Sequence, residues 1–238
     1  MEFPLIIRKI ALALAVLALV LLGASSLGVR AHWWPFPVGF KLLSGAVGCG
    51  AGALLLALIG LAVPQWRTGA VPTLLLSAVL GAGAAWFPLY MVQQAKALPL
   101  IHDISTDLDY PPAFVAVLPL RIEAANSAIH GGAELAAAQR SAYPDIEPLT
   151  LAASSADTYA RALAAAKRMG WTIVAEDSQS GRIEATATTF WFGFKDDVVV
   201  RITALDGGSR VDVRSVSRVG KSDVGANAAR IRAYLASL

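Results

Sequence analysis

The sequence predicts a membrane-anchored α+β protein: three N-terminal transmembrane helices, followed by a soluble domain with a four-stranded antiparallel sheet flanked by helices. One observation behind this prediction is the distribution of charge. Of the 17 acidic and 20 basic residues, only one acid and five bases lie before Lys96. The other is that helix-like and strand-like patterns follow one another regularly after Ser154. We therefore expect an anchor over residues 1–95 and a soluble domain over residues 96–238.

Three apolar runs make up the expected anchor, at about residues 5–27, 38–63 and 71–92. Each is long enough to cross a hydrocarbon core of roughly 30 Å at about 1.5 Å per residue. A cleaved signal peptide is the alternative interpretation of the first run. Pro88 is expected to kink or end the third helix. None of the runs contains an acid, so a transport pathway, which usually needs an ionisable residue at mid-depth, is not favoured.

Small residues in the second run indicate close packing between helices. Gly48 and Gly52 have the four-residue spacing that lets two helix backbones approach each other. The alternative is that small residues are simply common in transmembrane helices. The expected small-residue face consists of Gly45, Gly48, Cys49, Gly50 and Gly52.

The basic residues that flank the runs do not decide the orientation, because three lie on each side of a three-span anchor. We expect the N-terminus inside the cell, because Arg8 and Lys9 lie at the start of the first run. The soluble domain, with 15 bases and 16 acids, would then lie outside the cytoplasm. Its slightly negative net charge argues against nucleic-acid binding. The expected partner of the anchor is the lipid bilayer.

The first part of the soluble domain is expected to be irregular. Four prolines within residues 98–120 exclude a long helix and favour an extended linker, with Phe114–Leu118 as an edge strand. The alanine-rich stretch Arg121–Arg140 favours a helix, but Gly131 and Gly132 interrupt it.

The second part is expected to contain one helix, four strands and a final helix. The first helix begins at a cap on Ser154 or Ser155 and runs to about Met169. Turns are expected at Asp177–Gly181 and Asp206–Ser209, the second of them a hairpin turn. The four strands are expected at Trp171–Glu176, Arg182–Trp191, Val198–Leu205 and Arg210–Val216.

The last strand and the last helix each have a predicted buried face. In the strand, Val211 and Val213 are expected to point into the core and the charged residues to point outward. Those charged residues are Arg210, Asp212 and Arg214. Ser222 is expected to cap the final helix. The buried stripe of that helix is expected to contain Val224, Ala228, Ile231 and Leu235.

Five blocks of the soluble half occur in a fixed order: Asp103–Asp107, Ala142–Ile146, Gly181–Ala185, Phe192–Asp197 and Ser217–Asp223. Together they resemble the family called domain of unknown function 1499, over about residues 100–238. The resemblance implies a bacterial or plastid protein associated with the cell envelope. It implies no reaction, and it does not extend to the anchor.

The first candidate site is an aromatic run between two expected strands. It contains Phe190, Trp191, Phe192 and Phe194, and Gly193 offers a bulge or turn among them. Packing in the core is the alternative role for these rings, but a small sheet has limited capacity to cover all four. The remaining rings are expected to line a pocket or a protein-binding surface.

The second candidate site is the start of the final helix. Ser222 is expected to open that helix, with Arg218 and Lys221 beside it. Helix N-termini attract anions, so an anionic lipid headgroup or a carboxylate is the ligand expected there. The alternative is a capped helix whose flanking bases are solvated or paired with Asp223 or Asp212.

Catalytic chemistry has weaker support. His102, Asp103 and Asp107 suggest a metal-dependent hydrolase, but the chain has only three histidines, so such a site would need distant ligands. The alternative is a linker whose polar side chains make local turns. No serine lies in a G-x-S-x-G motif. Asp196 and Asp197 are adjacent, so on a strand they point to opposite faces and are not expected to share a site.

These observations favour a non-catalytic envelope module with several membrane spans in a bacterial inner (plasma) membrane and a periplasmic soluble domain. That domain is expected to bind a partner protein or another envelope component. A carrier of a lipid or a small apolar ligand is the alternative hypothesis, and a hydrolase is the third. The sequence predicts no cofactor and no metal.

Overall fold

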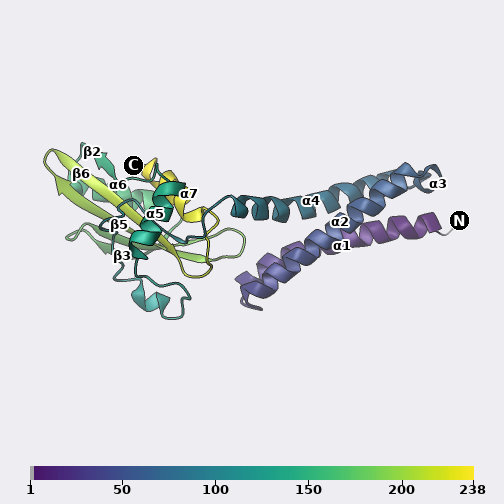
Figure 1. Cartoon of the computed structure of the whole chain (residues 1–238), viewed down its shortest axis with the longest axis horizontal. Coiled ribbons are helices and arrows are strands. Elements are labelled where there is room, and N and C mark those ends of the chain that lie inside the picture. Colours follow the sequence, from purple (N-terminus) through teal and green to yellow (C-terminus); the bar gives the residue numbers. More distant parts are fainter. Residues whose placement is uncertain (1–2) are drawn as a thin grey trace. The chain divides into compact units, whose positions relative to one another are not determined.

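The computed structural model describes residues 3–238, which fall into two compact units (Figure 1). The first unit comprises Met1–Gln94 together with Trp191–Gly193. The second comprises Ala95–Phe190 and Phe194–Leu238.

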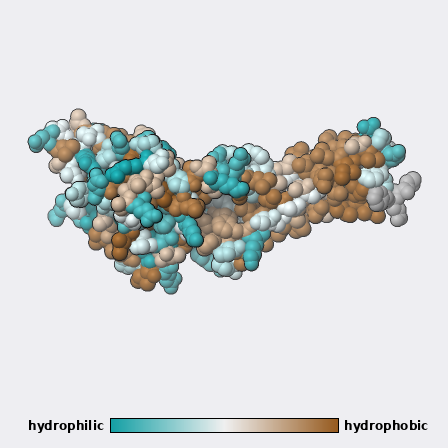
Figure 2. Space-filling view, viewed as in Figure 1, coloured by the Kyte–Doolittle hydropathy of each residue, from teal (hydrophilic) through white to brown (hydrophobic). Residues whose placement is uncertain are grey.

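The first unit is helical. Three of its helices, α1, α2 and α4, are long and apolar enough to cross a membrane, in agreement with the three predicted spans. Hydrophobic residues cover much of their surface (Figure 2). Pro88 lies inside α4, which continues to Lys96, so this proline does not end the helix. The bounds are α1 Phe3–Arg30, α2 Phe36–Ala62, the short α3 Pro64–Arg67, and α4 Val71–Lys96.

Two glycines mark the closest approach between α2 and α4. A Cβ atom added to Gly50 would lie 2.6 Å from the carbonyl oxygen of Gly81, and one added to Gly81 would lie 2.6 Å from that of Gly50. The predicted pair behaves differently: Gly48 has no neighbour within 4 Å, and Gly52 has only ordinary contact with Leu14. Close packing between α2 and α4 therefore occurs at Gly50, because Gly50 faces the backbone of α4 and the predicted pair, Gly48 and Gly52, does not.

The second unit contains an antiparallel sheet of six strands in the order β1-β6-β5-β4-β3, with β2 also paired to β6 (Figure 1). The predicted number of four is wrong because β1 and β2 are three residues long, too short for a recognisable alternation. The strands are β1 Asp103–Ser105, β2 Leu149–Leu151, β3 Thr172–Asp177, β4 Arg182–Thr188, β5 Lys195–Leu205 and β6 Gly208–Ser217.

The middle hairpin differs from its expected limits. Strand β4 ends at Thr188 and not at Trp191, and β5 begins at Lys195 and not at Val198. The pairing of Thr188 with Lys195 sets both limits, because the residues between them form the connecting loop. Asp196 and Asp197 therefore lie within a strand, with their side chains on opposite faces as predicted.

One predicted strand is replaced by a helical turn, η1, at Leu118–Arg121. The expected edge strand at Phe114–Leu118 is absent from the described chain because the backbone N–H groups of Val115 and Val117 donate to the Glu184 side chain and not to a neighbouring strand. The remaining helices are α5 Gly132–Ala142, α6 Ser155–Arg168 and α7 Ala226–Leu235. Helix α6 begins at the predicted Ser154 cap, whose Oγ accepts from the N–H of Asp157.

The final helix begins later than predicted, at Ala226. Asp223, and not Ser222, caps it: one carboxylate oxygen accepts from the N–H of Asn227 at 2.7 Å and the other from that of Gly225 at 2.9 Å. The two oxygens of the carboxylate thus accept from two of the donors that a helix start leaves open. Val224 therefore lies outside the helix. The buried residues of α7 are Asn227, Ala228, Ile231 and Tyr234.

The main core lies between one face of the sheet and the helices α6 and α7. Tyr234 is fully buried there, its ring stacks on Trp171 at 4.8 Å, and its hydroxyl donates to the carbonyl of Ala162. The sheet contributes Ile183, Ala185, Ala187, Val198, Val200, Ile202, Val211 and Val213. This face agrees with the predicted alternation.

The other face of the sheet is covered by residues 106–131, which we call the arm. A small cluster of Phe114 and Val117 from the arm packs on Val199 and Val216 of the sheet. The expectation that the charged residues of β6 point into solvent is wrong for two of the three. Asp212 and Arg214 are buried, because the arm and its neighbouring residues lie over them.

The glycine contact between α2 and α4 leads to a prediction. Changing Gly50→Leu should lower the melting temperature of the full chain in detergent, because its side chain would displace the backbone of α4. The matched control is Gly48→Leu on the same helix, where open space accepts a side chain. Thermal unfolding followed by circular dichroism measures both, and an equal fall in the two variants would contradict the assigned contact.

Candidate functional site

The most strongly buried charges of the second unit hold the arm against the sheet. Asp197 is inaccessible to solvent and receives hydrogen bonds from Arg121 at 2.7 Å, Arg218 at 2.8 and 2.9 Å, and Thr186 at 2.7 Å. Burial alone would raise the pKa of the Asp197 carboxyl, but the bonds from Arg218, Thr186 and Arg121 outweigh it and hold that pKa below its ordinary value. This carboxylate therefore joins the arm, β5 and the segment after β6.

A second buried ion pair holds the arm near both of its ends. Arg214 donates to both carboxylate oxygens of Asp103, at 2.9 and 2.8 Å, and both side chains are almost inaccessible. The same guanidinium donates to the carbonyls of Pro112 and Ala128, which lie near the two ends of the arm. Its central carbon lies 5.2 Å from the Phe114 ring centroid, a cation–π contact. Arg214 therefore fixes backbone and ring together.

A third group of charged side chains binds the first residues of the arm to the sheet. Asp107 accepts from Arg201 and Arg210, each at 2.9 Å, and both arginines also bind Asp212. Burial would raise the pKa of Asp107, but the backbone N–H groups of Tyr110 and Asp109 and the two arginines hold it below its ordinary value. The four charged groups form a closed network in which every acid faces a base.

The hydrolase candidates are not brought together. Asp103 and Asp107 bind different arginines, and the imidazole Nδ1 of His102 lies 3.5 Å from the carbonyl oxygen of Lys221. Over residues 3–238 there is no group of three His, Cys, Asp or Glu side chains that could hold a metal ion. The geometry assigns Asp103 and Asp107 to packing of the arm.

The predicted anion site also takes a different form. Arg218 points at Asp197 and forms two bonds with it, so its charge is already matched. Lys221 is exposed, while the Ser222 hydroxyl accepts from the N–H of Val224 and donates to the carbonyl of Pro99. With Asp223 at the helix start, the N-terminus of α7 presents a carboxylate where an anion was expected to bind.

The aromatic run forms the loop between β4 and β5, so Phe190 and Trp191 lie beyond the strand in which they were expected. Phe190 is 90% exposed, and the other three rings are partly buried. Within the first unit, the ring centroid of Trp191 lies 4.8 Å from that of Phe87, and the centroid of Phe192 lies 5.1 Å from that of Phe40. A binding role for these rings stays a prediction.

A further surface was missed by sequence reasoning: the outer side of the arm. Its exposed apolar side chains include Ile122 and Ile129, which are 83% and 84% exposed. The sequence carried a partial signal, since apolar residues alternate with prolines and polar residues in a stretch with no regular structure. The exposed members are Tyr110, Val115, Leu118, Leu120, Ile122 and Ile129.

A shallow cleft lies beside the start of α6. Its volume is about 570 Å³, and Ser155, Tyr159, Gln179 and Arg201 are among the residues that line it. The lining includes no acid and no histidine.

The fold and these contacts define a class of protein: a unit of long apolar helices joined to an α+β domain whose charged sheet face is closed by an arm. Residues 103–238 match the family model described as Protein of unknown function (DUF1499), which is more than half of the chain, so the protein belongs to this family. This confirms the resemblance noted in the sequence. No curated protein and no solved structure matches the chain.

The buried Asp197 leads to a stability prediction. Asp197→Ala should destabilise the folded domain by about 3–5 kcal/mol, because it leaves Arg121 and Arg218 buried without their counter-charge. The control Asp145→Ala removes a pair with Arg232 that is about half exposed, and little change is expected. Urea unfolding of the full chain in detergent measures both, and similar midpoints for the two variants would refute the role given to Asp197.

The same carboxylate predicts how stability depends on pH. Because the folded pKa of Asp197 lies below its ordinary value of 3.8, its contribution is complete above about pH 4 and is lost as pH falls through the folded pKa. Asp223 has the opposite effect. Burial raises the pKa of its carboxyl, so its contribution to the free energy of unfolding is lost as pH rises. The free energy of unfolding should therefore fall less between pH 4 and lower pH in Asp197→Asn than in the unchanged protein. An identical slope in urea titrations would contradict this.

Proposed function

We propose that this protein is a non-catalytic, membrane-anchored module of the bacterial cell envelope whose α+β domain binds a partner protein through the outer surface of the arm. The observation that carries the proposal is the exposure of apolar side chains on a segment that has no regular structure, with Ile122 and Ile129 more than four-fifths exposed. Six exposed large apolar side chains come from this one segment, and a concentration of apolar surface on a folded domain is a mark of interaction sites.

The arm suits recognition because it is held in one conformation. Arg121 and Arg214 bind it to buried acids, and Glu184 accepts from the backbone N–H groups of Val115 and Val117. A surface that is already ordered loses little conformational entropy when a partner binds. The exposed apolar side chains are thus presented on a fixed backbone, although the arm contains only one short helical turn.

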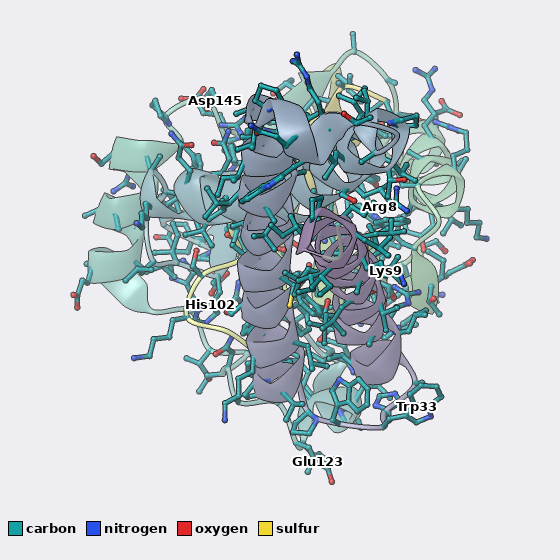
Figure 3. All side chains as sticks on the ribbon, turned by 90° about the vertical axis from the view of Figure 1, so that its right-hand side faces the viewer. Arg8, Lys9, Trp33, His102, Glu123 and Asp145 are labelled. Carbon is teal, nitrogen blue, oxygen red and sulfur yellow. The ribbon has the colours of Figure 1, made fainter. Side chains whose placement is uncertain are left out.

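The composition of the arm favours a protein over lipid as the occupant. Exposed polar residues, among them Glu123 and Ser127, lie between the apolar ones. The Glu123 side chain extends away from the ribbon (Figure 3). A carboxylate is costly to bury in hydrocarbon, whereas a protein interface combines an apolar centre with a polar rim.

The anchor supports the cellular setting that we propose. Three long apolar helices are compatible with a protein that spans a membrane. Arg8 and Lys9 lie near the start of α1 and Trp33 in the turn after it (Figure 3), so that the basic pair and the aromatic group mark opposite ends of the helix. With the basic pair inside, the α+β domain is periplasmic in a bacterial inner membrane.

An internal ligand is less well supported by the geometry. The layer between the sheet and the helices α6 and α7 is occupied by its own side chains, with Ile183, Val200 and Ile231 at most 1% exposed. Burial of this kind is what a packed core requires. A lipid or small apolar ligand held at this place would have to displace them, so we favour the outer surface.

Site-specific photo-crosslinking in the native cells tests the proposal. A photoreactive amino acid at Ile122 should produce a discrete adduct with another protein, and the adduct should disappear when Leu120→Asp is added, because a charge would enter the contact. The control position is Ser178, which is exposed in the turn after β3. Adducts with lipid alone, or a pattern equal to that from Ser178, would contradict a protein-binding arm.

A further inference from the structure

We infer that the loop between β4 and β5 is a second membrane contact of the α+β domain, with the exposed ring of Phe190 placed at the boundary between lipid headgroups and acyl chains. We call residues 189–194 the aromatic loop. The inference rests on three observations: the rigid turn that presents the rings, the end of the sheet at which it lies, and the short connection from α4 to that end.

The aromatic loop is closed at its base. The N–H of Thr189 donates to the carbonyl of Phe194 at 2.8 Å, and the Thr189 hydroxyl accepts from the N–H of Phe194 at 2.9 Å. Gly193 makes the turn possible because its φ of 70° is unfavourable for residues with a side chain. The rings are therefore carried on a defined turn, and Phe190 is 90% exposed on it.

The strand register places this loop at the end of the sheet where the chain enters the domain. Asp103, the first residue of β1, pairs with Val216, and the next residue of β6, Ser217, pairs with Asp196 at the start of β5. The loop directly precedes that start. Leu205, at the far end of β5, lies ten strand positions away, at the opposite end of the sheet.

The connection between α4 and this end of the sheet is short. Helix α4 ends at Lys96, and Leu98 already packs on the core of the domain. The carbonyls of Pro99 and Ile101 then accept from the Ser222 hydroxyl and the N–H of Asp223. One residue, Ala97, separates the helix from the domain, and a residue spans at most about 3.6 Å. With α4 as a membrane span, this end of the sheet must lie close to the membrane surface.

The chemistry of the loop fits that position. No charged residue lies between Thr188 and Lys195, so entry into the interfacial region carries no charge-burial cost. Phe190 is the exposed ring of the loop, and apolar aromatic rings such as Phe form the inserted face of elements that lie in the membrane interface.

A lipid-quenching experiment on the full chain tests the inference. In a Cys49→Ser background, Phe190→Cys is labelled with an environment-sensitive fluorophore, and the protein is reconstituted into phosphatidylcholine–phosphatidylglycerol nanodiscs. Lipids carry a nitroxide quencher near the headgroup or deep in the acyl chain. Leu205→Cys is the matched control, because Leu205 is also exposed and apolar but lies at the other end of β5.

The inference predicts blue-shifted emission at position 190 and stronger quenching by the shallow quencher, since interfacial groups lie about 5–10 Å into the headgroup–acyl boundary. The label at position 205 should emit as in water and show little quenching. Water-like emission at 190, with quenching equal to that at 205, would overturn the inference. So would blue-shifted emission without quenching, which would assign the loop to protein packing. Matching circular dichroism spectra show that both variants are folded.

Discussion

The buried Asp197 carboxylate and its two arginines form the contact on which the arrangement of the α+β domain depends. Arg121 comes from 76 residues before Asp197 in the chain, and Arg218 from 21 residues after it. A single inaccessible carboxylate thus connects the arm, the centre of the sheet and the segment that leads to α7. Loss of any one of these bonds is costly, because it leaves a charged group without a partner in a poorly hydrated place.

The sheet has two unlike faces, and both are covered. One is apolar and packs on α6 and α7, as in an ordinary α+β fold. The other carries Glu184, Asp197, Asp212 and Arg214, yet these residues are also buried. Because the charges on that face are satisfied within the protein, they are not available to an external ligand. Exposed apolar side chains lie instead on the outer side of the arm and on the aromatic loop.

The elements that could be predicted from the sequence are those with a long run of regular pattern or a recognisable local signal. The three spans, helix α6 with its Ser154 cap, and the opposite faces of Asp196 and Asp197 all follow from periodicity or capping within a short stretch. Strands β1 and β2 exist only because β6 pairs with them, so three residues of sequence do not reveal them.

The burial of the charged face was not predictable in the same way. Alternating charged and apolar residues normally indicate one wet face. Whether Asp212 and Arg214 meet water depends on the arm, about a hundred residues earlier in the chain. The candidate sites differ in the same way. The aromatic loop can be recognised from its composition, whereas the exposure of Ile122 can be seen only in the folded structure.

The pairing of β1 with β6 has a consequence for biosynthesis. Asp103 leaves the ribosome more than a hundred residues before its strand partner Val216, and Arg121 appears well before Asp197. Neither the first edge of the sheet nor the arm has its partners until β5 and β6 have been made. The first edge strand and the arm can therefore dock only after β5 and β6 have been made, and until then the buried side chains Phe114 and Val117 lack their cover.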